Sequence, residues 1–319
     1  MHKFSRITVK RAGSLFLLFA LSACLTLRGA DALRLPNGAV VAFVGGEDIV
    51  AMQQYGYVEL LLARPAHGQD IRFRNLGREG DTVFEQKRDL NFPSWEQALT
   101  KIGATVVIAQ FGQAESLRGA ETLPQFRVAA EKLFKTLAGT NRQLVLLSPT
   151  PFEKTSSPLP DIAGRNADLS ACTDALRELA HRHAWRFADV FRSPGNRSSL
   201  TRDGLHLNAA GHWRLALELS RSFGVSDANR SLRQDARTGR LAPSAAEQLR
   251  QAIIAKNRLW FDYWRPQNWA FLHGDRTEQP SSRDHRDPKV RWFPEEIEKF
   301  LPLIEAKERE AAELAKKLP

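Results

Sequence analysis

Short apolar runs and amphipathic stretches alternate along residues 38–223. The short runs predict buried strands, and the stretches with apolar residues at every third or fourth position predict helices. The predicted strands are residues 40–44, 71–75, 105–109, 143–147 and 185–190. The predicted helices are residues 49–63, 126–137, 167–183 and 209–222. This order, β-α-β-β-α-β-α-β-α, indicates a doubly wound parallel sheet with helices on both faces.

The pattern changes after residue 227. Residues 245–264 and 294–317 predict two helices, and the polar residues 275–289 predict a loop between them. Four of the seven tryptophans lie in this region, at Trp260, Trp264, Trp269 and Trp292. Such aromatic density has two interpretations: the region packs back on the core, or it offers an aromatic platform for sugars.

The first 32 residues have the pattern of an export signal. Four basic residues between Lys3 and Arg11 precede the apolar run 14–21, which is too short for a stable membrane span. Residues 21–24, Leu-Ser-Ala-Cys, resemble a bacterial lipobox that lipidates Cys24, and residues 30–32, Ala-Asp-Ala, fit an ordinary cleavage site. Both alternatives stay open. We expect an exported protein, periplasmic or otherwise extracytoplasmic, either released by cleavage or tethered to a membrane through Cys24.

Length and composition narrow the class of protein. A chain of 319 residues can bury one full core, so we expect a signal at 1–32, an α/β domain at 33–227 and a helical appendage at 228–319.

The formal net charge is +10, and it falls to +6 without residues 1–32. The basic residues are scattered, which argues against nucleic acid as a partner. Beyond residue 32, Cys172 is the one cysteine and cannot form an intramolecular disulfide. The sequence defines no oligomeric state.

The loops that follow the strands hold the candidate chemistry, because ligand groups gather at the carboxyl edge of a doubly wound sheet. One such loop places Asp203 three residues before His206, just ahead of a predicted helix. At this spacing the carboxylate can orient and polarise the imidazole as a general base. Residues 75–82, Asn-Leu-Gly-Arg-Glu-Gly-Asp-Thr, follow the second predicted strand.

In this order and context, the two blocks resemble those of the SGNH/GDSL hydrolase superfamily, which contains esterases, lipases and carbohydrate deacetylases. The resemblance covers roughly residues 38–223 and implies a flavodoxin-like, five-stranded parallel sheet. It implies that Asp203 and His206 match the family's acid and base. It also implies that Gly77 matches the glycine whose N–H stabilises the oxyanion.

Two positions depart from the family pattern. Glu47 stands where the nucleophilic serine belongs, and no serine occurs between Ser22 and Ser94. Ala114 stands where the oxyanion asparagine belongs, although its neighbour Gln113 could swing in as a substitute donor. Loss of the nucleophile alone typically lowers turnover about a millionfold.

The sequence therefore predicts a catalytically degenerate protein that binds an acylated or glycan-like ligand or a partner protein. The alternative is an active ester hydrolase with rebuilt chemistry around His206 and Asp203, using water or a metal in place of serine. We expect the Glu47 carboxylate to lie beside the His206 ring as an ion pair. One histidine among several carboxylates is a weak metal site, so no metal or other cofactor is expected. Arg78 and Glu115 either pair across the mouth of the pocket or are both solvated.

Overall fold

The computed structural model describes residues 35–64, 69–192 and 199–318. The predicted export signal, with Cys24, lies outside these residues. Among the helices of the described residues, none is both long and apolar enough to cross a membrane.

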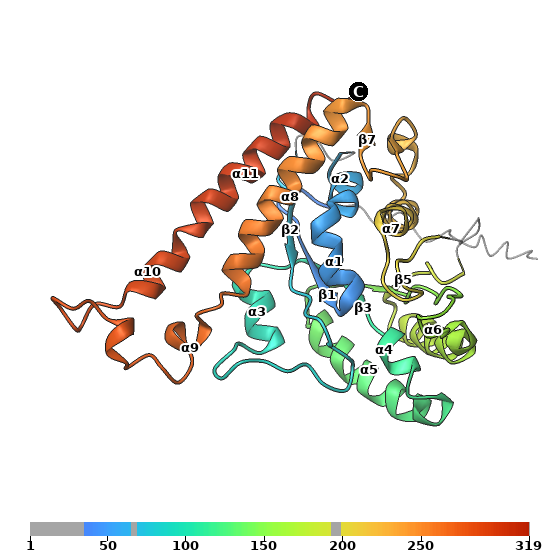
Figure 1. Ribbon diagram of the computed structural model, residues 1–319, viewed down its shortest axis with the longest axis horizontal. Coiled ribbons are helices and arrows are strands. Elements are labelled where there is room, and N and C mark those ends of the chain that lie inside the picture. The colour runs from blue at the N-terminus through green and yellow to red at the C-terminus, as the bar shows by residue number, and fades with distance from the viewer. Residues whose placement is uncertain (1–34, 65–68, 193–198, 319) are drawn as a thin grey trace, which may run out of the picture. The chain divides into compact units, whose positions relative to one another are not determined.

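Five parallel strands form the central sheet (Figure 1). They are β1 Val40–Gly45, β2 Arg72–Asn75, β3 Val106–Gln110, β4 Gln143–Leu147 and β5 Arg186–Ala188. Their order is β2-β1-β3-β4-β5, with Val41 of β1 paired to Phe73 on one side and Val106 on the other. This is the flavodoxin-like order, which reverses direction between β1 and β3. The predicted fold class is confirmed.

Helices cover both faces because successive strand residues point in opposite directions. The helices of the α/β part are α1 Glu47–Tyr55, α2 Tyr57–Ala63, α3 Trp95–Lys101, α4 Gln113–Ser116, α5 Leu123–Ala138, α6 Asn166–Arg182 and α7 Ala209–Ser222. Val41 and Phe43 face α1, α2 and α7 in one core cluster. Ala42 and Val44 face α3, α5 and α6 in the other. Short 3-10 turns lie at Ala120–Thr122, Ala163–Arg165, Asp227–Asn229 and Pro280–Ser282.

The helix prediction was wrong in three places. The helix expected over 49–63 is split at Gly56, whose φ of 69° ends α1 and starts α2. Helix α3 was missed, although Ser94 and Gln97 form a capping box at its start. The helix expected over 294–317 is two helices, Trp292–Glu298 and Phe300–Ala315. Pro302 lies in the first turn of the second helix, where a proline is tolerated, whereas it would break the interior of one continuous helix.

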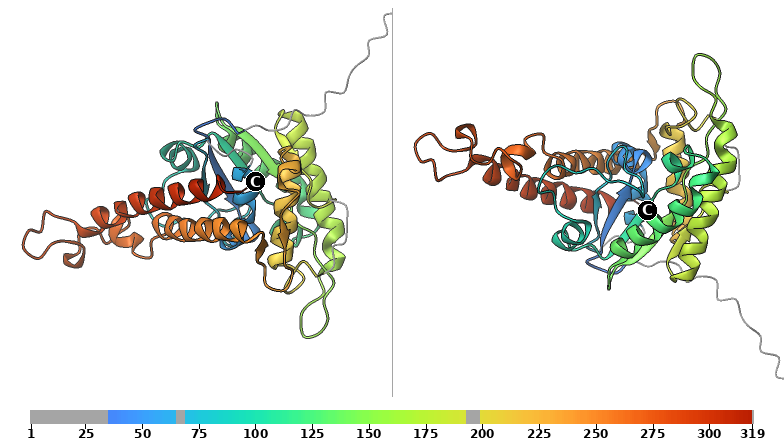
Figure 2. Two further views of the ribbon diagram at one scale, coloured as in Figure 1. Left: turned by 90° about the horizontal axis from the view of Figure 1, so that it is seen from above. Right: turned by 90° about the horizontal axis from the view of Figure 1, so that it is seen from below.

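The C-terminal region forms a helical hairpin. Its elements are α8 Ser244–Trp264, α9 Trp269–Leu272, α10 Trp292–Glu298 and α11 Phe300–Ala315, preceded by an antiparallel ribbon of β6 Arg233–Gln234 and β7 Leu241–Ala242. Helices α8 and α11 run side by side and extend beyond the sheet, with α9 and α10 at the far end (Figures 1 and 2). Residues 32–319 form one compact unit.

Helix α8 wraps the β2 edge of the sheet. Ile253 belongs to the core cluster on one face, and Trp260 and Trp264 belong to the cluster on the other. Trp292 is 45% exposed, whereas Trp260 is 2% and Trp264 is 8% exposed. Of the two interpretations of the tryptophan-rich region, packing back on the core accounts for Trp260 and Trp264. Coverage by α8 also protects an edge strand that would otherwise expose unpaired backbone groups.

Charged groups join the hairpin to the α/β part. Nζ of Lys256, which is 1% exposed, lies 2.7 Å from the Glu59 carboxylate of α2. Arg74 of β2 lies 2.5 Å from Glu308 of α11. Burial raises the pKa of Glu59 and lowers the pKa of Lys256, and their mutual attraction opposes both shifts. Each charge of this buried pair therefore depends on the other.

Replacing Lys256 tests this dependence. Lys256→Met keeps the side-chain length but strands the Glu59 carboxylate, so we expect a loss of about 3–5 kcal/mol in the free energy of unfolding, measured by urea denaturation. The exposed pair Arg309 and Glu305 of α11, 4.0 Å apart, provides the control. Arg309→Met should cost less than about 1 kcal/mol. Equal losses would contradict an anchoring role for the buried pair.

Candidate functional site

The carboxyl ends of the strands surround a pocket. Its walls come from the start of α1, the loop after β2, and α4 after β3. The lining residues are Gly46, Glu47, Asp48, Gly80, Asp81, Gln110, Phe111, Gly112, Gln113, Ala114 and Glu115. Gly45 allows this convergence, because a Cβ there would lie 2.3 Å from the Gln110 carbonyl oxygen. The pocket therefore lies at the edge predicted to hold the chemistry.

Asp203 and His206 form a hydrogen-bonded pair on the loop before α7. Nδ1 of His206 lies 2.7 Å from Oδ2 of Asp203, and the His206 backbone N–H donates to Oδ1 at 2.8 Å. Burial alone would raise the pKa of Asp203, but the hydrogen bonds from His206 and Leu205 outweigh it and lower that pKa to about 2. The carboxylate is thus ionised and accepts from Nδ1, which leaves Nε2 as the basic nitrogen of the neutral ring.

The His206 ring is hydrogen-bonded to no hydroxyl of the described residues. Within the described ranges, it has no hydrogen-bond partner other than Asp203. The Thr82 hydroxyl is engaged in a turn with Glu85, and the Thr150 hydroxyl donates to Asp48 at 2.7 Å. In the part of the chain that the structure describes, the imidazole is therefore oriented by Asp203 without a hydrogen bond to a hydroxyl.

Glu47 lines the pocket but does not form the expected ion pair with His206. Across the part of the chain that the structure describes, its side chain has neither a hydrogen bond nor an ion pair. The pitch of α1 is the physical reason. Asp48, Met52 and Tyr55 share its inward face, so the buried carboxylate belongs to Asp48 and Glu47 stays half-exposed.

Asp48 is the residue that the sequence analysis missed. It is 6% exposed and accepts the Thr150 hydroxyl at 2.7 Å. Burial raises its pKa to about 6, while the bond from Thr150 and the nearby His206 act in the opposite direction. Asp48 thus ties the start of α1 to the loop after β4. Its helical spacing to Met52 and Tyr55 was the available signal.

The glycine expected to bind an oxyanion is already engaged. Gly77 is buried, and its N–H donates to Oδ1 of Asn75 at 2.9 Å. Gly80 is exposed, lines the pocket and has a φ of 76°. Among the hydrogen bonds of the described residues, none uses the Gly80 N–H. Gly80 is therefore the better-placed donor of this loop.

The third loop supplies no replacement donor to the pocket. Ala114 lines the pocket with a methyl group. Nε2 of Gln113 donates to the Thr150 hydroxyl at 3.0 Å, so the amide holds the loop after β4. Neither interpretation of Arg78 and Glu115 is correct. Glu115 is 2% exposed and accepts the backbone N–H groups of Val83 and Gly112, while Arg78 pairs with Asp89.

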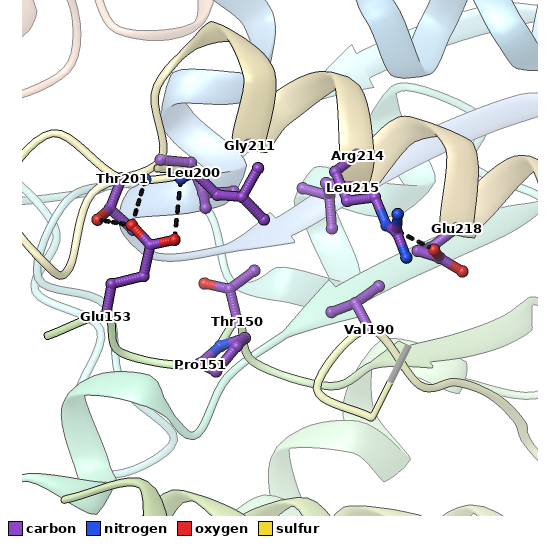
Figure 3. A pocket seen from close by; sticks show the side chains of 11 residues that line it. Thr150, Pro151, Glu153, Val190, Leu200, Thr201, Gly211, Arg214, Leu215 and Glu218 are labelled. Atoms are coloured by element: carbon purple, nitrogen blue, oxygen red, sulfur yellow. Dashed lines mark hydrogen bonds and ion pairs between the residues drawn. The ribbon is translucent and has the colours of Figure 1, made fainter. Parts of the chain in front are cut away.

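A second pocket lies between the loop after β4 and helix α7 (Figure 3). Thr150 lines this pocket while its partner Asp48 lines the first, so the hydrogen-bonded pair separates the two. The Glu153 carboxylate accepts the N–H groups of Leu200 and Thr201, and Arg214 pairs with Glu218. Its carboxylates are therefore satisfied by the chain itself.

Neither pocket holds a recognisable metal site. Throughout residues 35–64, 69–192 and 199–318, no group of three or more His, Cys, Asp or Glu side chains is placed to hold a metal ion.

The fold and site define a class: a flavodoxin-like α/β protein with a histidine–aspartate pair at the carboxyl edge of its sheet. The model of the GDSL-like lipase/acylhydrolase family matches residues 41–214, more than half of the chain. The chain belongs to this family, and the predicted resemblance is confirmed. No curated protein matches the sequence.

Several solved structures are similar in fold. BT4096, a gut microbial diltiazem-metabolizing enzyme, has a TM-score of 0.58 at 14% identity, over 91% of this chain and 96% of its own. Axe2, an acetylxylan esterase from Geobacillus stearothermophilus, has a TM-score of 0.47 at 17% identity, over 60% and 97%. The acetyl xylan esterase AlAXEase has a TM-score of 0.46 at 20% identity, over 57% and 98%.

The raised pKa of Asp48 can be tested through the pH dependence of the free energy of unfolding. Its raised pKa means that the folded state binds this proton more tightly than the unfolded state, so its contribution to stability is largest at low pH. That contribution falls by about 2–3 kcal/mol as the pH rises from about 4 to 7. Asp48→Asn keeps an acceptor for Thr150 and cannot ionise. We expect its stability relative to the parent protein to increase with pH over this range, measured by urea denaturation.

The exposed Asp262 provides the matched control. Asp262→Asn should follow the pH dependence of the parent protein. Parallel pH profiles for Asp48→Asn and the parent would show that the carboxyl of Asp48 does not titrate in this range.

Proposed function

We propose that this GDSL-like protein is exported and binds an acylated or glycan-like small molecule at the carboxyl edge of its sheet without forming an acyl-enzyme. The observation that carries this proposal is the His206 ring, which Asp203 orients but to which no hydroxyl of the described chain is hydrogen-bonded. A family hydrolase needs a nucleophile whose proton the imidazole accepts. Here the family's serine position is occupied by Glu47, the first residue of α1, which has no hydroxyl.

The pocket itself supports a retained binding role. Gly80 and Gly112 bring backbone close to the pocket, Phe111 supplies an apolar wall, and Gln113 is held by Thr150. Buried polar groups are satisfied: Glu115 accepts two backbone N–H groups, and Asp48 accepts a hydroxyl. An ordered pocket of this kind can orient a ligand through a few polar contacts.

The intact pair of Asp203 and His206 favours one alternative, a hydrolase in which Nε2 of His206 activates water. Export, with release or with a tether through Cys24, is part of the main proposal and rests on the sequence of residues 1–32.

Hydrolysis of p-nitrophenyl acetate and of acetylated sugars separates the two functions. If the protein only binds, the parent and His206→Ala should hydrolyse all of these esters at the same background rate. A water-activating hydrolase should exceed His206→Ala by about a hundredfold or more, since general base catalysis typically contributes about 10²–10⁴. That result would contradict the binding proposal. Ligand binding is followed by thermal shift with the same acetylated sugars.

The double variant Glu47→Ser, Ala114→Asn tests whether the missing serine and asparagine account for the proposed lack of esterase activity. It restores a serine hydroxyl and an oxyanion amide at the family positions, while Asp203 and His206 stay in place. We expect p-nitrophenyl acetate hydrolysis above the parent, and its loss when His206→Ala is added. Activity that survives His206→Ala would show that the added serine does not use this histidine.

A further inference from the structure

One long loop carries part of the pocket. Residues 76–94 connect β2 to α3 and contain neither helix nor strand. Gly80 and Asp81 of this loop line the pocket. Loops of this length are uncommon in compact domains and need support from elsewhere to hold one conformation.

The C-terminal hairpin supplies aromatic contacts to this loop. The Phe92 ring lies 5.0 Å from the ring of Trp264, edge to face, and 4.8 Å from that of Trp269. Aromatic pairs in such geometries contribute about 0.5–1.5 kcal/mol each beyond the area they bury. We call Phe92, Trp264 and Trp269 the aromatic clasp.

Polar contacts between the same two segments surround the clasp. Nε1 of Trp269 donates to the Leu90 carbonyl at 2.8 Å, and Nδ2 of Asn91 donates to the His273 carbonyl at 2.8 Å. Arg265 lies 2.7 Å from the Glu79 carboxylate. The hairpin thus contacts the loop at several points along the length of the loop.

A chain of contacts leads from the clasp to the pocket. The guanidinium of Arg88 lies 5.8 Å from the Phe92 ring centroid and 5.1 Å from that of Trp95. The same guanidinium donates to both carboxylate oxygens of Asp81 at 2.7 Å. Asp81 is 6% exposed and lines the pocket. Such a bidentate pair fixes the orientation of both groups.

We propose that the C-terminal hairpin is the positioning element of the pocket. The aromatic clasp holds Phe92, Phe92 and Trp95 hold Arg88, and Arg88 holds Asp81 and the neighbouring Gly80 in place. Phe92 is a positioning residue that acts through Arg88. The importance of this wall for ligand binding rests on the proposed function, but the positioning itself does not.

Backbone hydrogen exchange tests the positioning without any ligand, so its failure is distinct from failure of the proposed function. Phe92→Ala removes the ring at the centre of the clasp, and we expect the hydrogen-bonded amides of residues 78 and 81–83 to exchange about tenfold faster, while those of β1 and β3 keep their protection. Phe92→Tyr retains the ring and should restore slow exchange. Phe293→Ala is the matched control, because Phe293 is another half-buried ring, on α10, whose centroid lies 5.7 Å from that of Phe271 in an edge-to-face arrangement.

Local exchange that rises in Phe92→Ala, returns in Phe92→Tyr and stays unchanged in Phe293→Ala supports the proposal. Unchanged exchange of residues 78 and 81–83 in Phe92→Ala overturns it. An equal rise across β1, β3 and the loop also overturns it, since that result would mean general destabilisation rather than positioning.

Discussion

The hydrogen bond from His206 to Asp203 sets the chemistry available at the carboxyl edge of the sheet. It fixes the ring through Nδ1 and leaves Nε2 as the basic nitrogen. A base in this state can act only on a proton within its reach. In the described chain no hydroxyl is hydrogen-bonded to it, and Glu47 at the start of α1 carries no hydroxyl. The family's scaffold is therefore present, and we propose that the covalent step is absent.

Two buried charged residues, Asp48 and Lys256, connect separate parts of the fold. Asp48 links α1 to the loop after β4 through Thr150, and burial raises its pKa to about 6. Lys256 links the hairpin to Glu59 of α2. Because BT4096 matches 91% of this chain, the unmatched part is shorter than residues 228–319, and most of the hairpin has a counterpart in that fold. The hairpin is thus part of the folded unit.

Features of the site that depend on residues close in sequence could be predicted. Features that depend on how helices and loops pack on the sheet could not. The pairing of Asp203 with His206 spans three residues of one turn, so spacing alone predicts it. Which carboxylate of α1 faces His206 depends on how the helix sits on the sheet, and Asp48 rather than Glu47 is the buried one. The N–H of Gly77 points to Asn75, a contact set by the fold of the loop rather than by the motif.

The central claim is that this site orients a base but activates no hydroxyl. Its most direct test is reaction of the purified protein with a fluorophosphonate, which modifies only activated hydroxyls, followed by intact mass spectrometry. The account predicts no increase in mass. A single adduct that maps to a hydroxyl such as that of Thr150, and that disappears in His206→Ala, would contradict it.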